Sequence, residues 1–366
     1  MSVRQIVLAD GTKRWEVRTD VGEPDGTRRQ VRRRYRTERE AKQADAKTVT
    51  QVAEGTFVAR DQRTVRTFLT EWVDGRVDLL STTRHHYRSN LRPIIATYGD
   101  LQLQRLAKRH VDAWVREMTG KGRSPRTVNL TLTVLSAALD AAVKGRLIAR
   151  NPVLLVSRPR PETRVAGQAW TAAQCATFLT RASQQRESAL WRLTMMGLRR
   201  GEVLGLRWSD VDLDKGLIHV RQARVLEGGV VVVNPPKTKA GIRSLPIPAE
   251  VVEDLKALRT KQVAERLAHG SYRDPELVAV DTIGRGLRPE WYSEEFHRIA
   301  AAAKLPRIRL HDARHSAASL MAALGIPASI AAECLGHDPV VYMRTYVHNY
   351  ADDRRVAMET LADAVR

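Results

Sequence analysis

The spacing of apolar and polar residues divides the chain into three regions, and the first region is β-rich. Here apolar and β-branched positions alternate with charged ones, at Trp15, Val17, Thr19, Val31 and Tyr35. The alternation predicts two strands, and the Asp25-Gly26 pair between them is typical of a hairpin turn. Thr37 and Glu40 have the spacing of a capping box, which predicts a following helix. We therefore expect residues 1–57 to form a small β-rich module backed by one helix.

Residues 61–156 change to helical spacing and predict four helices. The apolar residues that share a face in each helix are Phe68, Leu69, Trp72 and Val73; Tyr87, Leu91, Ile94 and Ile95; Val111, Trp114, Val115 and Met118; and Val128, Leu132, Leu135, Leu139 and Ala142. The fourth helix also has terminal signals, since Ser124 and Pro125 begin it and Gly145 ends it. Residues 157–168 are rich in proline and arginine and predict a linker.

Residues 169–366 mix both patterns and predict a mainly helical α+β domain. A helix is expected near Thr171, and an apolar run over 189–206 is interrupted by Gly197. Residues 250–303 are expected to be mostly helical.

Short strands are expected inside this domain, over 210–220 and 228–233. The segment 237–241 has the composition of a hairpin turn, with 243–248 returning as the second strand. Lys237 is not part of a P-loop, because the residues before it do not match the glycines of GxxxxGK[ST].

The stretch from Leu310 to Tyr346 predicts three short helices that carry polar chemistry. Apolar residues at helical spacing predict a first helix ending at Gly325. Pro327 is suited to begin the second helix and Gly336 to end it, and Asp338-Pro339 can begin the third.

His311 and Arg314 stand three apart on the first of these helices, so they are neighbours on one face. A phosphate could lie between them. The alternative is structural: a solvated charge and histidines that are satisfied by hydrogen bonds.

The charge of the chain points to a polyanionic partner. Among 366 residues, 61 Lys and Arg stand against 41 Asp and Glu, which gives +20, while 43% of the residues are apolar, as in a folded protein. Phosphate neutralisation favours nucleic acid as the partner. The rival is an anionic membrane surface, but the sequence has no apolar run long enough to span a bilayer and no lipidation motif.

Two further features of the sequence indicate the expected compartment and the role of the cysteines. The first residues lack the sections of a signal peptide, so the expected location is the cytoplasm. Cys175 and Cys334 are far apart and have no CxxC spacing. Neither a disulfide framework nor a thiolate metal site is therefore expected.

Arginines mark two candidate DNA-binding surfaces. Those of the second strand are Arg28, Arg29, Arg32, Arg33, Arg34 and Arg36. A two-stranded ribbon that carries them can enter a major groove, although a charge run can also simply face solvent. Those of the helical block are Arg84, Arg88, Arg123 and Arg126.

Six residues together supply what a metal-independent phosphodiester transfer requires, and they are Arg199, Lys237, His311, Arg314, His337 and Tyr346. Two guanidiniums can bind the non-bridging oxygens and stabilise the developing charge. A lysine can protonate a leaving oxygen, and a histidine can move a proton near neutral pH. A tyrosine can act as nucleophile if a base and a positive field are near.

The motifs that contain these residues resemble the tyrosine recombinases, and specifically phage-type integrases. The similar segments are GLRRGEVLGLRWSDVD, PKTKAGIRSLPIP, HDARH and LGHDPVVYMRTYVH. The resemblance implies a phosphate clamp of Arg199 and Arg314, with Lys237 as general acid. It further implies His311 as acid/base, His337 as second histidine and Tyr346 as nucleophile, while Glu202 supports the first arginine.

The resemblance also implies the organisation and the activity. The expected domains are an arm-site-binding domain over 1–57, an all-α SAM-like core-binding domain over 61–156 and a tyrosine-recombinase catalytic domain over 169–366. The implied reaction cleaves and rejoins DNA through a 3'-phosphotyrosine and integrates or excises a mobile element, without cofactor or metal. The implied partners are core and arm att sites, a homotetramer on DNA, a directionality factor and a host DNA-bending protein, on the nucleoid of a host bacterial cell.

The residue pattern is compatible with several alternatives. Tyr342 and Tyr350 flank Tyr346 at helical spacing, and Lys239 lies beside Lys237, so residue spacing alone does not choose among them. His311 and His315 have the spacing of a zinc-hydrolase motif, but Asp312 replaces its glutamate. A type IB topoisomerase-like enzyme and a non-catalytic DNA-binding regulator are the other rival functions.

Overall fold

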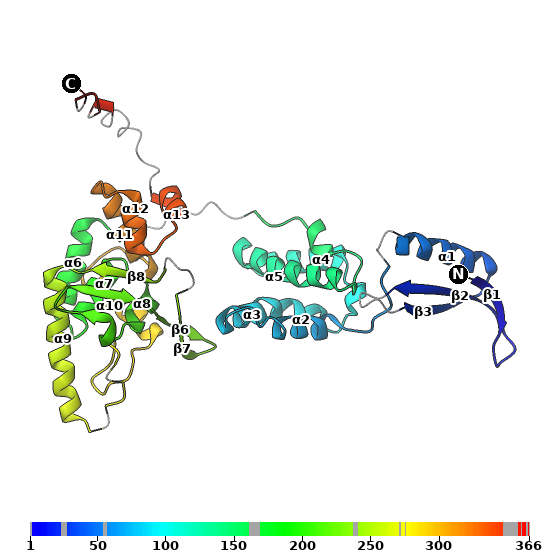
Figure 1. Ribbon diagram of the computed structural model, residues 1–366, viewed down its shortest axis with the longest axis horizontal. Coiled ribbons are helices and arrows are strands. Elements are labelled where there is room, and N and C mark those ends of the chain that lie inside the picture. The colour runs from blue at the N-terminus through cyan, green and yellow to red at the C-terminus, as the bar shows by residue number, and fades with distance from the viewer. Residues whose placement is uncertain are drawn as a thin grey trace. The chain divides into compact units, whose positions relative to one another are not determined.

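The computed structural model describes residues 2–22, 28–53, 57–160, 169–236, 241–270, 272–274, 276–346, 358–359, 361–363 and 365. The chain forms two compact units, residues 1–163 and 164–366, so the boundary lies inside the 157–168 segment. Figure 1 shows the elements of each unit.

The first unit begins with a three-stranded antiparallel sheet in the order β1-β2-β3. Its strands are β1 (Ser2–Val7), β2 (Lys13–Gly22) and β3 (Arg28–Tyr35), and helix α1 (Glu38–Ala53) packs against it. The expected two-stranded ribbon is wrong in strand number, because β1 pairs along β2 from Ser2 opposite Arg18 to Val7 opposite Lys13. The capping box is confirmed, with the Glu40 amide donating to Thr37 Oγ1 at 3.2 Å. Asp25-Gly26 lies outside the described residues.

Four helices follow, as predicted, and their apolar faces form one core. They are α2 (Val65–Asp74), α3 (Ser81–Tyr98), α4 (Lys108–Gly120) and α5 (Pro125–Lys144). Ser124 caps α5 by accepting from the Thr127 amide at 3.3 Å, and Gly145 ends the helix. Two short 3₁₀ turns, η1 (Leu103–Arg105) and η2 (Pro152–Leu155), complete the block.

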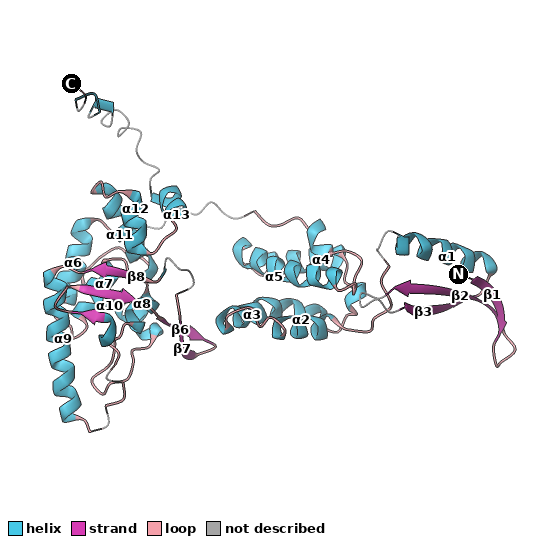
Figure 2. Ribbon diagram, viewed as in Figure 1, coloured by secondary structure: helices cyan, strands magenta, loops and turns pink. Residues whose placement is uncertain are grey.

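The second unit surrounds small sheets with helices (Figure 2). The helices are α6 (Ala172–Ala182), α7 (Ser188–Met195), α8 (Arg200–Gly205), α9 (Ala249–Ala268), α10 (Pro289–Ala302), α11 (Leu310–Ala323), α12 (Ala328–Leu335) and α13 (Pro339–Tyr346), with the 3₁₀ turn η3 (Trp208–Asp210). The strands are β4 (Val211–Asp212), β5 (Leu217–Val220), β6 (Ala223–Glu227), β7 (Val230–Asn234) and β8 (Arg243–Pro246).

The sheet pairing corrects one expectation. Among the described residues, one sheet has the order β4-β5-β8 and the other consists of β6 and β7. The strand after residue 241 therefore does not return against β7 as a hairpin; β8 pairs with β5, from Val220 opposite Arg243 to Leu217 opposite Pro246. The physical reason is burial, since β8 places Arg243 and Leu245 in the interior beside the buried Ile218 and Val220.

A cluster of buried aromatic side chains packs α7 against α10, two helices of the second unit that lie next to its polar residues in the sequence. Trp191 of α7 stacks on Tyr292 of α10 with 4.1 Å between ring centroids, and Phe178 and Phe296 pack beside them. The Trp170 indole donates to the Pro306 carbonyl at 2.9 Å, just before α11. These large buried side chains hold α7, α10 and α11 in one rigid core.

The last three helices occur where the sequence predicts them. Gly325 follows α11, and Gly336 ends α12 in the left-handed region with φ 60°. The Val340 amide donates to Asp338 Oδ1 at 2.8 Å and so begins α13. No helix within the described ranges is long and apolar enough to cross a membrane.

Candidate active site

A polar pocket of about 440 Å³ brings together residues from three separate segments of the second unit. Arg199 and Arg200 come from the start of α8, Ser293 and His297 come from α10, and the start of α11 contributes three more polar residues. Those from α11 and its N-cap are Arg309, His311 and Arg314. The structure therefore places Arg199, His311 and Arg314 around one cavity, although 112 positions separate Arg199 from His311 in the sequence.

Arg199 is the N-cap of α8 and is held by Glu202, three residues later. Its Nη1 donates to Glu202 Oε1 at 2.7 Å, and its backbone amide donates to Oε2 at 2.9 Å. The break before α8 follows from Gly197, whose φ of 92° is a conformation that glycine adopts without steric strain. Glu202 thus contacts Arg199 directly, in the way that a residue supporting this arginine would.

Glu202 also binds a second, buried arginine that the sequence analysis did not select. Arg243 of β8 donates through Nη1 and Nη2 to the two carboxylate oxygens, at 3.2 and 3.0 Å. Burial acts to raise the pKa of the Glu202 carboxyl, but the hydrogen bond and charge of Arg243, followed by Arg199, lower the pKa below its ordinary value. Glu202 is therefore an ionised group that two guanidiniums share.

Arg243 lies within the PKTKAGIRSLPIP segment, which also contains Lys237. The signal that could have selected it is the alternation Arg243, Leu245, Ile247, which predicts that the arginine side chain points inward with the two apolar ones. A buried arginine needs a carboxylate partner, and the sequence did not identify which one it would meet.

The carbonyl end of α12 receives three guanidiniums in succession. Arg243 Nε donates to the Cys334 carbonyl at 2.9 Å, and Arg199 Nη2 donates to the Gly336 carbonyl at 2.8 Å. Between them, Arg314 Nη2 donates to the Leu335 carbonyl. The last carbonyls of a helix lack intrahelical partners and carry partial negative charge, so they are natural acceptors for arginine.

Arg314 is almost completely covered, with 2% of its surface exposed. Its Nη1 donates to the Gly197 carbonyl at 2.6 Å, which connects α11 to the turn before α8. Its Nε donates to His337 Nε2 at 3.2 Å. The guanidinium of this α11 residue therefore binds both the turn before α8 and the loop after α12.

His337 is neutral in this environment. Burial, followed by the charges of Arg314 and Arg199, lowers its pKa to about 3. Because Nε2 accepts from Arg314, the imidazole proton resides on Nδ1, which is the only atom through which the neutral ring can donate.

His311 lies at the exposed start of α11 and lines the pocket. Its ring meets that of His315 edge to face, with 5.1 Å between centroids. Partial burial and then the charge of His315 and Arg314 lower the pKa of His311 below its ordinary value. It is therefore a neutral base at pH 7, next to the Arg314 guanidinium.

Asp312 of the same helix has a structural role. It accepts from the Arg309 amide at 3.0 Å and from Arg309 Nη2 at 2.6 Å, and so caps α11. Within the described part of the chain, no three His, Cys, Asp or Glu side chains are placed to hold a metal ion.

The tyrosines of α13 differ in environment. Tyr342 is 1% exposed, and its hydroxyl donates to the Ala318 carbonyl at 3.0 Å, so it belongs to the small core between α11, α12 and α13. Tyr346 is the last residue of α13. Its side chain, like all of Lys237, Lys239 and Tyr350, lies outside the described residues.

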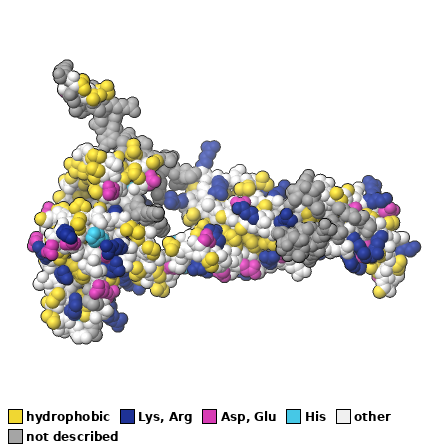
Figure 3. Space-filling model, viewed as in Figure 1, with side chains coloured by type: hydrophobic (Ala, Val, Ile, Leu, Met, Phe, Trp, Pro, Cys, Tyr) yellow, Lys and Arg dark blue, Asp and Glu magenta, His cyan; other side chains and the backbone are white. Residues whose placement is uncertain are grey.

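The arginines of the N-terminal sheet surround a buried carboxylate. Glu16 of β2 accepts from Arg4 at 2.9 Å and from Arg18 at 2.8 Å, while Arg34 lies 3.8 Å away. Arg32, Arg33, Arg34 and Arg36 are exposed, and Lys and Arg side chains gather over this sheet in Figure 3. Arg28 and Arg29 lie in β3, but their side chains are outside the described set.

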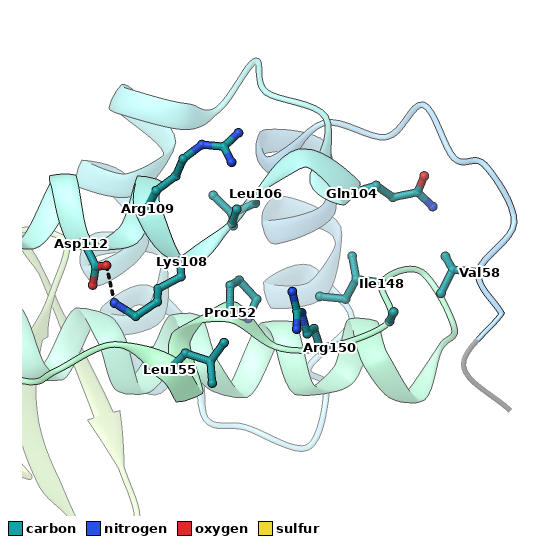
Figure 4. A pocket seen from close by; sticks show the side chains of 12 residues that line it. Val58, Gln104, Leu106, Lys108, Arg109, Asp112, Ile148, Arg150, Pro152 and Leu155 are labelled. Atoms are coloured by element: carbon teal, nitrogen blue, oxygen red, sulfur yellow. Dashed lines mark hydrogen bonds and ion pairs between the residues drawn. The ribbon is translucent and has the colours of Figure 1, made fainter. Parts of the chain in front are cut away.

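The helical block offers a second basic surface. Arg123 and Arg126 are exposed, Arg88 pairs with Asp74 at 2.7 Å, and Arg84 is partly buried. A pocket of about 650 Å³ adds further cationic side chains between η1, α4 and η2, and Figure 4 shows Arg109 and Arg150 beside it. Lys108 at its rim is neutralised by Asp112, at 2.5 Å. Arg150 is a basic residue that the sequence analysis did not single out.

Comparison with known proteins gives consistent matches. A sequence profile of the phage integrase family matches residues 171–353, which is half of the chain. The tyrosine recombinase XerC-like protein of Caldanaerobacter subterraneus subsp. tengcongensis is 26% identical over 298 residues, covering 76% of each chain.

Solved structures share the fold. The integrase of the transposon Tn1549, in complex with transposon right-end DNA, has a TM-score of 0.68 at 22% identity and covers 82% of this chain and 99% of that chain. A lambda integrase tetramer bound to a Holliday junction has a TM-score of 0.57 at 17% identity, over 92% of this chain and 94% of that one. The fold is thus lambda integrase-like, with an N-terminal sheet, a helical region and a larger region with small sheets.

The family match covers the pocket and the helices that form it. In the structure, Arg199 of the GLRRG segment and Arg314 of the HDARH segment line the same cavity. The chain belongs to the phage integrase family of site-specific tyrosine recombinases, enzymes that break and rejoin DNA.

Proposed function

We propose that the pocket between α8, α10 and α11 holds the scissile phosphate of a DNA att site. The observation that carries this proposal is the convergence of Arg199, His311 and Arg314 on one cavity of about 440 Å³. Two guanidiniums can bind the non-bridging oxygens and stabilise the charge that accumulates on them as the phosphorus becomes five-coordinate.

The proposed reaction is a transfer of the phosphodiester from DNA to Tyr346. The phenol oxygen attacks phosphorus, the bond to the 5'-oxygen breaks, and a 3'-phosphotyrosine forms. His311, neutral near pH 7, accepts the phenol proton, and Lys237 protonates the 5'-oxygen as it leaves. The 5'-hydroxyl of a partner strand reverses these steps and restores a phosphodiester, so no high-energy cofactor and no metal enter the balance.

Tyr346 is favoured over Tyr342 by burial and hydrogen bonding. The hydroxyl of Tyr342 is committed to Ala318 inside a core. Tyr346 ends the helix that begins just after His337, and the carbonyls before His337 are bound by Arg199 and Arg314. The proposed nucleophile is therefore only one short helix away, along the chain, from the carbonyls that the two clamp arginines bind.

The domain roles and partners are part of the same proposal. Residues 1–57 bind arm sites, residues 61–156 are a SAM-like domain that grips the core site, 157–168 link them to the catalytic domain over 169–366, and four copies assemble on DNA. A directionality factor and a host DNA-bending protein select integration or excision of the mobile element, in the cytoplasm of a host bacterial cell. Integrases of the same fold have been solved in complex with core-site, transposon-end and junction DNA, which supports this assignment.

The test begins by identifying the DNA site. DNA covalently bound to the protein is recovered from cells that express the chain and sequenced, and a duplex with that core and a nick beside the scissile position is synthesised. We expect an SDS-resistant protein–DNA complex in the presence of EDTA with the wild-type chain and with Tyr342→Phe, and none with Tyr346→Phe. A complex that persists in Tyr346→Phe, or one that requires a divalent ion, contradicts the proposal.

A further inference from the structure

A buried arginine outside the proposed phosphate clamp binds three residues that lie near the clamp in sequence or in space. Arg243 is 4% exposed at its side chain and makes four hydrogen bonds. Two of them go to Glu202, one to the Cys334 carbonyl at 2.9 Å and one to the Gly241 carbonyl at 3.3 Å. Each acceptor belongs to a different segment of the second unit.

The three segments are those that carry proposed catalytic groups. Glu202 holds Arg199 through a 2.7 Å hydrogen bond. Cys334 lies three residues before His337, in the last turn of α12. Gly241 lies four residues after Lys237, where the chain enters β8. One guanidinium therefore binds the carboxylate that holds Arg199, the end of the helix before His337 and the first described residue after the Lys237 segment.

We propose that Arg243 is a positioning residue for the recombination reaction, which sets Arg199 through Glu202 and the segment before His337 through the Cys334 carbonyl. This inference rests on the proposed function, because it takes the groups that Arg243 positions to be those that act on the phosphate. Arg243 acts through these partners rather than on the phosphate, because its side chain is 4% exposed and does not line the pocket that holds Arg199, His311 and Arg314.

The chemistry of the side chain explains why an arginine occupies this position. A planar guanidinium presents its five N–H groups in fixed directions, so it can hold a carboxylate in bidentate fashion and still reach two carbonyls. A lysine ammonium has the charge but only three donors on one atom. An apolar side chain leaves the buried Glu202 carboxylate with Arg199 as its remaining arginine partner.

The consequence for Glu202 provides a readout that a purely structural role would not change. Arg243 supplies the largest of the influences that lower the pKa of Glu202. In Arg243→Met the pKa of Glu202 rises, so the carboxyl is protonated at a higher pH and releases Arg199. Cleavage by Arg243→Met should therefore decline on acidification at a higher pH than cleavage by the wild type.

Arg186 gives a matched control within the same unit. Its side chain is 17% exposed, its Nε and Nη2 bind the two oxygens of Glu265 at 2.8 and 2.6 Å, and its Nη1 binds the Val280 carbonyl at 2.6 Å. Arg186 lies outside the pocket of the proposed clamp. Arg186→Met therefore reports the general effect of removing a buried, bidentate arginine.

The experiment measures single-turnover cleavage of the nicked core-site duplex between pH 5.5 and 8.5, at a temperature where circular dichroism shows each variant folded. We expect Arg186→Met to cleave within about threefold of the wild type and Arg243→Met to be slower by about a hundredfold, as for a misplaced reacting group. Adding Glu202→Gln to Arg243→Met should cost less than about threefold more and should abolish the added pH dependence, because the two residues act as a unit.

Three results would overturn the inference. The first is an Arg243→Met variant that cleaves as fast as Arg186→Met. The second is a slower variant whose pH profile matches that of the wild type. The third is a double variant whose loss of cleavage rate equals the product of the losses caused by Arg243→Met and Glu202→Gln separately.

A second variant covers the case in which Arg243→Met does not fold. Arg243→Lys retains the charge, and we expect it to fold and to cleave at least about tenfold more slowly than the wild type. Wild-type cleavage by Arg243→Lys would then contradict the inference. If the wild-type chain itself formed no covalent complex, the proposed function would fail instead, and the two failures are thus distinct.

Discussion

At the scale of residues, the site is organised by guanidiniums that bind carbonyl oxygens as well as carboxylates. Arg199, Arg243 and Arg314 each donate to one of three consecutive carbonyls at the end of α12. A helix end is a weak anion, so these bonds hold the cations in place without fully neutralising them. The positive field needed for a phosphate is therefore preserved.

The two tyrosines of α13 should separate stability from chemistry. Tyr342→Phe removes the hydroxyl that bonds the Ala318 carbonyl, and we expect it to lower the free energy of unfolding by about 1 kcal/mol. Chemical denaturation measures this change, and cleavage of the nicked duplex should remain within a few-fold of wild type. Cleavage that falls as severely as in Tyr346→Phe would show that Tyr342 takes part in the reaction.

His337 should make the second unit sensitive to acid. Its pKa is about 3 in the folded chain and near 6.5 when unfolded, so the unfolded state binds more protons between these values. The stability is complete above about pH 7 and declines as the pH falls below 6.5. Between pH 7.5 and 5 we expect His337 alone to account for a loss of about 2 kcal/mol.

The measurement is thermal unfolding at both pH values for the wild type, His337→Gln and the exposed control His269→Gln. The change in unfolding temperature between pH 7.5 and 5 should be smaller in His337→Gln than in the other two proteins. An equal change in all three would contradict the buried neutral state of His337.

At the scale of elements, the turn between α7 and α8 determines how closely α12 approaches. Gly197 has φ 92°, and a Cβ at this position would overlap Leu335 Cδ2 and lie 3.3 Å from Ala317 Cβ. The Gly197 carbonyl also accepts from Arg314. A larger residue here must move α12 and the arginines bound to its end.

Gly325 provides a matched comparison for this contact. It has φ 71° and open space around its Cβ position, so Gly325→Ala introduces backbone strain without a clash. We expect both alanine variants to lose about 1 kcal/mol of stability from the strained φ, with Gly197→Ala losing more and cleaving at least about tenfold more slowly. If Gly197→Ala cleaved as fast as Gly325→Ala, the position of α12 would not matter for the reaction.

The helices and their ends could be predicted from the sequence because their signals are local. The capping pair Thr37 and Glu40, the Ser124-Pro125 start and the glycine at 336 each act within a few residues. The pairing of β8 with β5 could not be predicted, because it depends on burial against residues more than twenty positions away. The burial of Tyr342 and the partners of Arg243 escaped prediction for the same reason.

At the scale of the whole molecule, net charge and the arginine surfaces predict strongly salt-dependent DNA binding. Each phosphate contact that is removed should reduce the slope of log affinity against log salt by about 1. Replacing exposed Arg32 and Arg34 of β3 by glutamine should therefore lower the slope by up to about 2 on an arm-site duplex.

The control for this prediction is Arg298→Gln, an exposed arginine of α10 that pairs with Glu295 at 2.5 Å. Fluorescence anisotropy between 50 and about 300 mM salt measures the slopes. An unchanged slope in the double variant would show that these arginines do not bind phosphate and that β3 has another role.

The four segments that resemble tyrosine recombinases predicted the family and its activity, which the family match confirms. The cavity shared by Arg199, His311 and Arg314 required the structure, because three distant segments form it. The catalytic roles of these three residues, like those of Lys237, His337 and Tyr346, remain predictions, and the proposed mechanism depends most on Lys237 and Tyr346.

The most direct test of the account is recovery of the DNA-linked peptide from the trapped covalent complex. The complex is digested with protease and nuclease, and mass spectrometry locates the nucleotide adduct. We expect a 3'-phosphate ester on the Tyr346 hydroxyl. An adduct on Tyr342, Tyr350 or any other residue, or a linkage to a 5'-phosphate, would contradict it.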